Sequence, residues 1–96
     1  MPEPVVTHQP GSDGRSGVFE LHINDSQAGF LDYGLPDART FNIDYVEVNP
    51  AMRGRQLGER LVDAAVAWAK GEGRTVTATC GFARRVLAAR AAVSRG

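Results

Sequence analysis

Residues 46–58 read Val46-Glu47-Val48-Asn49-Pro50-Ala51-Met52-Arg53-Gly54-Arg55-Gln56-Leu57-Gly58. The valine-rich run predicts a strand, and the glycine and arginine residues after it form a short loop that leads directly into an amphipathic run. The first N–H groups of a helix have no partner within the helix and carry partial positive charge, so they favour a bound phosphate. Glycine lets such an anion approach the backbone, and arginine adds charge. The stretch therefore indicates an anion site, although an ordinary solvated turn has the same composition.

Three extended segments precede this loop. From Gly17 the chain alternates between apolar and polar residues, which places Phe19, Leu21 and Ile23 on one face of a strand. Residues 27–33 resume an extended pattern after a turn at residues 24–26. The connections are short, so the segments predict an antiparallel meander.

The third extended segment, residues 40–48, leads into the loop. Strict alternation along it predicts Phe41, Ile43 and Tyr45 on one face and Val46 and Val48 on the other. Glu47 lies between the two valines, and we expect it to project to the face opposite theirs.

Two helical segments and one further strand follow the loop. The first helix has an apolar stripe formed by Leu57, Leu61, Ala64, Ala65 and Trp68. Residues 75–79 are strongly β-prone and predict a returning strand, and residues 82 to about 93 predict the last helix. The sequence thus predicts an α/β (α+β) fold, with a mainly antiparallel sheet of about four strands and two helices in the order β-β-β-α-β-α.

Residues 1–16 are rich in proline, glycine and serine, and this composition predicts a disordered leader before a single domain at residues 17–96. The 96 residues carry 11 basic and 11 acidic side chains, which argues against nucleic acid or an anionic membrane as a partner. No segment has the apolar length of a membrane span. A single cysteine excludes an internal disulfide and favours a reducing, cytoplasmic location. Neither histidine has a partner at metal-ligand spacing, so we expect no metal site.

Arg53-Gly54-Arg55-Gln56-Leu57-Gly58 resembles the acyl-CoA motif of the GNAT acetyltransferase superfamily, Arg/Gln-x-x-Gly-x-Gly/Ala. Residues 17 to about 90 are also similar to its small single-domain branch, described as YjdJ-type or NATD-like, which has an Arg-Gly loop and a strand ending in Cys-x-Phe. Cys80-Gly81-Phe82 stands at that strand end. The resemblance implies a reduced GNAT fold.

The resemblance implies that acetyl-CoA binds as a co-substrate, with its pyrophosphate on the backbone of residues 53–58. That segment contains the expected cofactor-binding residues Arg53, Gly54, Arg55, Gln56, Leu57 and Gly58. The pantetheine arm would pair with the strand edge at Val46 and Val48, since its amides resemble those of a β-strand. We expect the arginines of the last helix, Arg84, Arg85 and Arg90, on a solvated face, from which Arg84 or Arg85 could reach the 3′-phosphate of CoA.

Two residues are candidates for catalysis. The resemblance assigns Glu47 the role of general base for an ammonium acceptor, although a strand carboxylate is also commonly just solvated. Cys80 is either a small packing residue or, because a helix N-terminus stabilises a thiolate, a nucleophile or acid. Gln56 replaces the first motif glycine, and neither tyrosine lies on the last helix, where many larger members of the superfamily have one as general acid.

The sequence thus predicts an acetyl-CoA-dependent N-acetyltransferase that acts on a primary amine, such as a lysine, a polyamine or a small amine. The alternative is a non-catalytic CoA-binding or protein-interaction module with the same fold. The sequence leaves the oligomeric state open.

Overall fold

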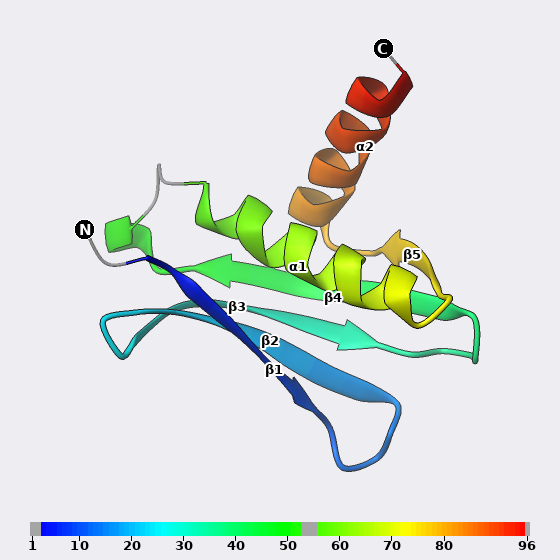
Figure 1. Cartoon of the computed structure of the whole chain (residues 1–96), viewed down its shortest axis with the longest axis horizontal. Coiled ribbons are helices and arrows are strands. Elements are labelled where there is room, and N and C mark those ends of the chain that lie inside the picture. Colours follow the sequence, from blue (N-terminus) through cyan, green and yellow to red (C-terminus); the bar gives the residue numbers. More distant parts are fainter. Residues whose placement is uncertain (1–2, 53–55, 96) are drawn as a thin grey trace.

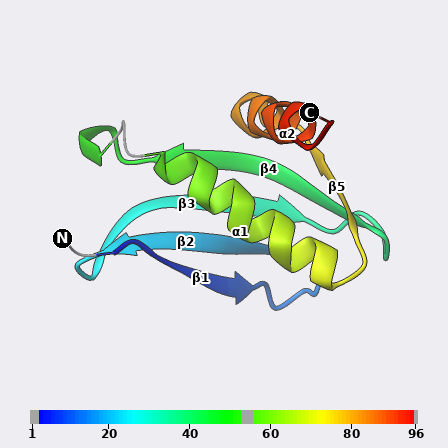
Figure 2. The ribbon, with the colours of Figure 1, turned by 45° about the horizontal axis from the view of Figure 1, so that its top comes forward.

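The computed structural model describes residues 3–52 and 56–95. Its elements are β1 (Val5–Pro10), β2 (Ser16–Ile23), β3 (Ser26–Gly34), β4 (Thr40–Val48), the 3₁₀ turn η1 (Pro50–Met52), α1 (Leu57–Gly71), β5 (Thr75–Ala78) and α2 (Gly81–Arg95). The strands form one sheet in the order β1-β2-β3-β4-β5. Helix α1 crosses one face of this sheet, and α2 projects from the edge at β4 and β5 (Figures 1 and 2). The face covered by α1 is called the inner face and the opposite one the outer face.

The sheet has five strands rather than about four, because part of the segment that we expected to be disordered forms β1. This strand pairs antiparallel with β2 from Val5 opposite His22 to Pro10 opposite Gly17. The prediction of a disordered leader is therefore wrong for residues 5–10, and β2 begins at Ser16. Composition was a poor guide here, because the strand depends on contacts with residues distant in the sequence.

His8 provides the main contacts that order β1. Its ring stacks on Phe19 with centroids 4.2 Å apart and meets Trp68 edge-on at 4.6 Å. Its Nε2 atom shares a hydrogen bond of 2.7 Å with the phenol oxygen of Tyr33. Aromatic contacts of this kind add to the free energy of burial, so His8, together with Val6, attaches β1 to the core.

The alternation expected in the first strand of the meander, β2, is confirmed. Phe19, Leu21 and Ile23 are all buried and point toward α1. Asn24 and Asp25 form the tight turn between β2 and β3 with positive φ angles of 52° and 66°. Two successive left-handed residues fit a turn whose twist matches that of the flanking strands, and asparagine and aspartate tolerate them. The core between the sheet and α1 is completed by Leu31, Tyr33, Phe41, Ile43, Leu57, Leu61, Val62, Ala65 and Ala69.

Strand β4 contains a bulge that the sequence pattern did not predict. Tyr33 pairs with Ile43 and Asp32 pairs with Tyr45, so Asp44 has no opposite residue on β3. The extra residue reverses the alternation. As a result, Tyr45 lies on the outer face with 48% of its surface exposed, instead of sharing a face with Phe41 and Ile43 as expected.

Beyond the bulge, Val46 and Val48 pack against the inner core. The predicted returning strand, β5, is present; it pairs parallel with β4, and α1 forms the connection between them. Within the described part of the chain, no helix is both long and apolar enough to cross a membrane.

The burial of His8 predicts a pH-dependent stability. Desolvation lowers the pKa of His8 below its ordinary value of 6.5. The unfolded chain then binds more protons near that pH than the folded one, so the stability contribution is complete above pH 6.5 and is lost as the pH falls below it. We expect the free energy of unfolding to fall less in His8→Phe than in the wild type between about pH 7.5 and about pH 5.5, as measured by urea denaturation. Parallel pH dependences in the two proteins would contradict this role.

Candidate functional site

Strands β4 and β5 separate at the bulge. Their pairing covers residues 40–43 of β4 and 75–78 of β5. The backbone N–H groups of Thr79 and Cys80 then both donate to the carbonyl of Ile43, at 3.1 and 3.3 Å, and the chain turns away into α2. In the described part of the chain, residues 44–48 therefore have no strand partner on this side of β4. Free backbone donors and acceptors at a strand edge can pair with an extended ligand.

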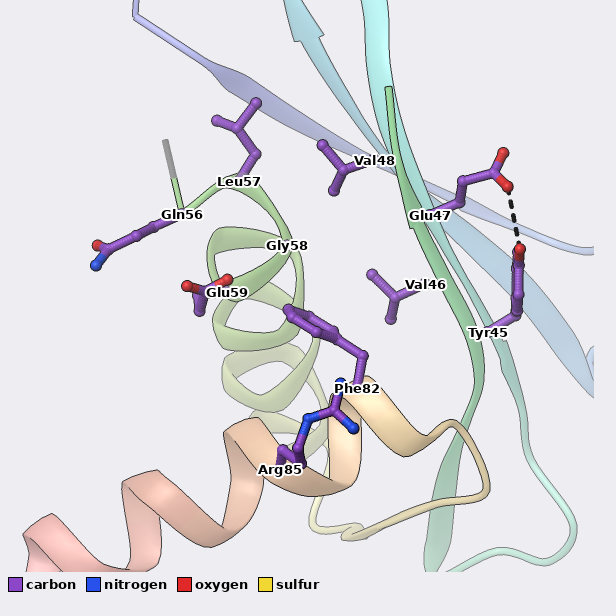
Figure 3. A pocket seen from close by; sticks show the side chains of 10 residues that line it. All are labelled: Tyr45, Val46, Glu47, Val48, Gln56, Leu57, Gly58, Glu59, Phe82 and Arg85. Carbon is purple, nitrogen blue, oxygen red and sulfur yellow. Dashed lines mark hydrogen bonds between the residues drawn. The ribbon is translucent and has the colours of Figure 1, made fainter. Parts of the chain in front are cut away.

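A cleft of about 540 Å³ lies beside this free edge. Its size is within the usual range for a small-molecule site. Figure 3 shows Val46 and Val48 on one wall, the start of α1 on the other, and Phe82 between them. The lining residues are Tyr45, Val46, Glu47, Val48, Gln56, Leu57, Gly58, Glu59, Phe82 and Arg85.

Helix α1 begins at this cleft with an unusual backbone conformation. Gln56, its N-cap residue, lies in the left-handed region with φ 58° and ψ 33°, and its side chain does not cap the helix. The carbonyl of Gln56 accepts the N–H of Arg60 at 3.2 Å. The N–H groups of Leu57, Gly58 and Glu59 come before that bond and belong to the orphan donors of the first turn. A glycine would adopt this φ without strain, which explains in backbone terms why the acyl-CoA motif has glycine at this position.

Gly58 is required first of all for packing. A Cβ atom at this position would lie 2.6 Å from the ring of Phe82, closer than real Cβ contacts allow. The missing side chain therefore lets the ring from α2 lie against the first turn of α1. This contact closes the floor of the cleft, and the sequence pattern alone had suggested only an anion-binding role for Gly58.

The charges around the cleft are mixed. Among the described lining residues, Arg85 is the one cation, and Glu47 and Glu59 are the carboxylates. Arg53, Gly54 and Arg55, which the sequence assigned to cofactor binding, lie outside the described residues. Among the described residues, no group of three or more histidine, cysteine, aspartate or glutamate side chains is placed to hold a metal ion.

Glu47 projects to the face opposite Val46 and Val48, as predicted (Figure 3). The phenol of Tyr45 donates a hydrogen bond of 3.0 Å to its Oε1 atom. This bond, together with the negative charge of Glu47, raises the pKa of Tyr45. No role for Tyr45 was predicted from the sequence. Because of the bulge, its side chain and that of Glu47 both lie on the outer face.

Cys80 stands between β5 and α2. Its side chain is half-buried, and its carbonyl accepts the N–H of Arg84 at 3.0 Å, so it occupies the N-cap position of α2. The prediction that it directly precedes a helix is confirmed. Cys80 is not among the described residues that line the cleft, whereas Phe82 and Arg85, one turn along α2, are. The sequence offered Arg85 as a phosphate ligand but gave no signal for the wall formed by Phe82.

Known proteins share this architecture. Residues 18–94 match the family described as GCN5-related N-acetyl-transferase. No curated protein matches the sequence. The fold is similar to a ribosomal-protein-alanine N-acetyltransferase from Brucella melitensis biovar Abortus 2308, with a TM-score of 0.68 and 16% identity over 78% of this chain and 62% of that one. This chain thus spans less than two thirds of that protein.

Two further solved structures are similar at comparable levels. The aminoglycoside N-acetyltransferase AAC(6')-Iy in complex with CoA gives a TM-score of 0.66 and 12% identity, over 81% of this chain and 76% of that one. An IAA acetyltransferase from Bacillus cereus ATCC 14579 gives a TM-score of 0.69 and 18% identity, over 79% of this chain and 65% of that one. Identities this low show a common fold. The sequence match covers most of the chain and agrees with that fold, and so this chain belongs to the GCN5-related N-acetyltransferase family.

Proposed function

We propose that this protein transfers an acetyl group from acetyl-CoA to a primary amine. The observation that carries the proposal is the separation of β4 and β5, which leaves residues 44–48 of β4 unpaired beside a cleft that ends at the start of α1. An extended thioester cofactor with an anionic end fits such a cleft. The solved relative AAC(6')-Iy, which has the same fold, was crystallised with CoA.

In the proposal, two groups of described residues bind acetyl-CoA: one on β4 and one at the start of α1. The backbone of Val46 and Val48 would pair with the amides of the pantetheine arm. The first N–H groups of α1, at Leu57 and Gly58, would face the pyrophosphate together with Gln56. Arg53, Gly54 and Arg55 complete this set in the proposal, and their charge would offset the carboxylate of Glu59, which lines the same cleft. Arg85 on α2 is the candidate ligand of the 3′-phosphate.

Glu47 acts as general base in the proposed reaction. Its carboxylate takes one proton from the substrate ammonium, and the freed nitrogen lone pair forms a bond to the acetyl carbonyl carbon. The carbon–sulfur bond breaks and its electron pair remains on sulfur. The second nitrogen-bound proton ends on that sulfur, so the products are the amide, CoA thiol and the proton held by Glu47.

Cys80 offers a second route. Its thiolate would attack the acetyl carbon, release CoA and pass the acetyl group to the amine in a second step. Its N-cap position places it at the start of α2. The position of Cys80 outside the set of cleft-lining residues favours direct attack.

The acceptor class in the proposal is a primary alkylamine, such as a lysine side chain or a polyamine. The carboxylate of Glu47 on the outer face supports a cationic substrate. The single cysteine is consistent with a reducing, cytoplasmic setting.

The first test is ligand binding. Acetyl-CoA at about 100 times its Kd should stabilise the folded state by about 2.7 kcal/mol, which raises Tm by roughly 10 °C in a domain of this size. Differential scanning fluorimetry measures the shift, with adenosine as a control that lacks the pyrophosphate and the pantetheine. An unchanged Tm would rule out the proposed function. A shift without amine-dependent release of CoA thiol would instead support the non-catalytic CoA-binding module.

The second test separates the two catalytic routes. Direct attack predicts that Glu47→Gln lowers kcat about a hundredfold or more, while Cys80→Ala keeps most of the activity. Release of CoA thiol gives the rate, and the acetyl-CoA-induced rise in Tm shows that each variant still binds the cofactor. Glu72→Gln, at the far end of α1, is the matched control. Loss of turnover in Cys80→Ala with cofactor binding retained would assign the reaction to an acetyl-cysteine route.

The third test concerns the start of α1. Because Gln56 has a positive φ, Gln56→Gly should raise the free energy of unfolding by about 1 kcal/mol. It should also tighten acetyl-CoA binding, because the backbone becomes more accessible to the pyrophosphate. Gln9→Gly in the extended strand β1 is the control, and should lower stability by roughly 0.5–1 kcal/mol. Equal effects of the two changes would show that the backbone at Gln56 is not strained.

A further inference from the structure

The outer face of the sheet carries two aromatic side chains next to the proposed base. Phe30 on β3 pairs directly with Glu47 on β4, so the two side chains are neighbours on this face. The ring of Tyr45 lies 5.9 Å from that of Phe30, tilted by 46°. Tyr45 also donates to Glu47, so the two rings and the carboxylate form one connected group. In the described part of the chain, no helix covers this face (Figure 2).

A shallow hollow of about 350 Å³ adjoins this group. It is lined by Gln27, Ala28, Gly29, Phe30, Glu47, Asn49 and Pro50. Glu47 is the charged residue of this lining and also lines the cleft proposed for acetyl-CoA. Glu47 thus borders two depressions, and its carboxylate points away from the valine wall of the inner cleft (Figure 3).

We propose that Phe30, Tyr45 and Glu47 form the acceptor subsite, and that it binds a primary alkylammonium group at the end of an unbranched chain. The inference rests on the proposed acetyl transfer and names its substrate class. Aromatic faces attract cations, and a carboxylate beside them supplies the opposite charge. The neutral remainder of the hollow suits the methylene chain that carries the ammonium group.

The geometry also explains why the acceptor approaches from the outer face. On the inner side of β4, Val46, Val48, Phe82 and the start of α1 enclose the cleft (Figure 3). Glu47 and Tyr45 lie on the other side of the strand. An amine held by them reaches the acetyl group at the gap between β4 and β5, which opens beyond Ile43. Donor and acceptor therefore do not compete for the same space.

Hydrogen bonding between the two side chains gives Tyr45 a separate role in this subsite. Its phenol engages Oε1 of Glu47, which fixes the carboxylate in one orientation on the outer face. Phe30 supports the ring of Tyr45 in turn. The ammonium group then meets a carboxylate that is already positioned beside the two rings.

The test measures binding without requiring catalysis. Titration of the ¹⁵N-labelled protein with n-pentylammonium should give saturable shifts of the amide resonances of Phe30, Tyr45 and Glu47, whereas n-pentanol, which lacks the charge, should not. Phe30→Leu should weaken binding about fivefold, as expected for the loss of a cation–π contact near the surface. Val5→Ala removes apolar surface on the exposed strand β1 and should leave binding unchanged.

Two further probes distinguish the sources of the ammonium group. Nα-acetyl-lysine methylamide represents a lysine side chain and spermidine a free polyamine, and the one that binds more tightly identifies the natural class. The inference is overturned if n-pentylammonium gives no saturable shift, if n-pentanol binds equally well, or if Phe30→Leu binds like the wild type. A Tm increase with acetyl-CoA alongside any of these results would leave the proposed function standing and remove only this subsite. Saturable ammonium binding without a Tm increase in acetyl-CoA would remove the proposed function and leave only an ammonium-binding site.

Discussion

The bulge at Asp44 is the feature on which the arrangement of the site depends. One unpaired residue in β4 reverses the order in which side chains alternate, so that Phe41 and Ile43 before it and Val46 and Val48 after it all face α1. Parallel pairing with β5 stops at Ile43, one residue before the bulge. The free strand edge, the cleft beside it and the outward direction of Tyr45 and Glu47 all follow from that local change in register.

The sequence predicted the helices and strands more accurately than their register and their contacts with one another. Alternation identified β2, and helical spacing identified α1, because each of these patterns results from a face that is buried along the whole element. The bulge has no such pattern in the sequence, because a polar residue such as Asp44 is equally common at an ordinary outward-facing position of a strand. Strand β1 was missed for a different reason: its ordering depends on His8 meeting Phe19, Tyr33 and Trp68, and such long-range contacts cannot be read from local composition.

The same limit applies to the candidate site. The loop motif predicted a ligand site at the start of α1, where the structure has a cleft, and that role stays a prediction. The structural reason for Gly58 is the ring of Phe82, which comes from another helix. Glu47 was placed on the correct face by simple alternation from Val46 and Val48, which holds because all three residues follow the bulge. Its partner Tyr45 was assigned to the wrong face because alternation was carried across the bulge from Ile43.

A small domain gains a particular advantage from using both sides of one strand. Val46 and Val48 contribute to the core and to the wall of the inner cleft, while Tyr45 and Glu47, which alternate with them, need no burial and remain available to solvent and ligand. Four consecutive residues thus serve stability, proposed cofactor binding and proposed acceptor binding, with each task assigned by the direction of the side chain. The proposed acceptor position on the outer face needs no additional helix to enclose it, and in the described part of the chain no helix covers that face (Figure 2).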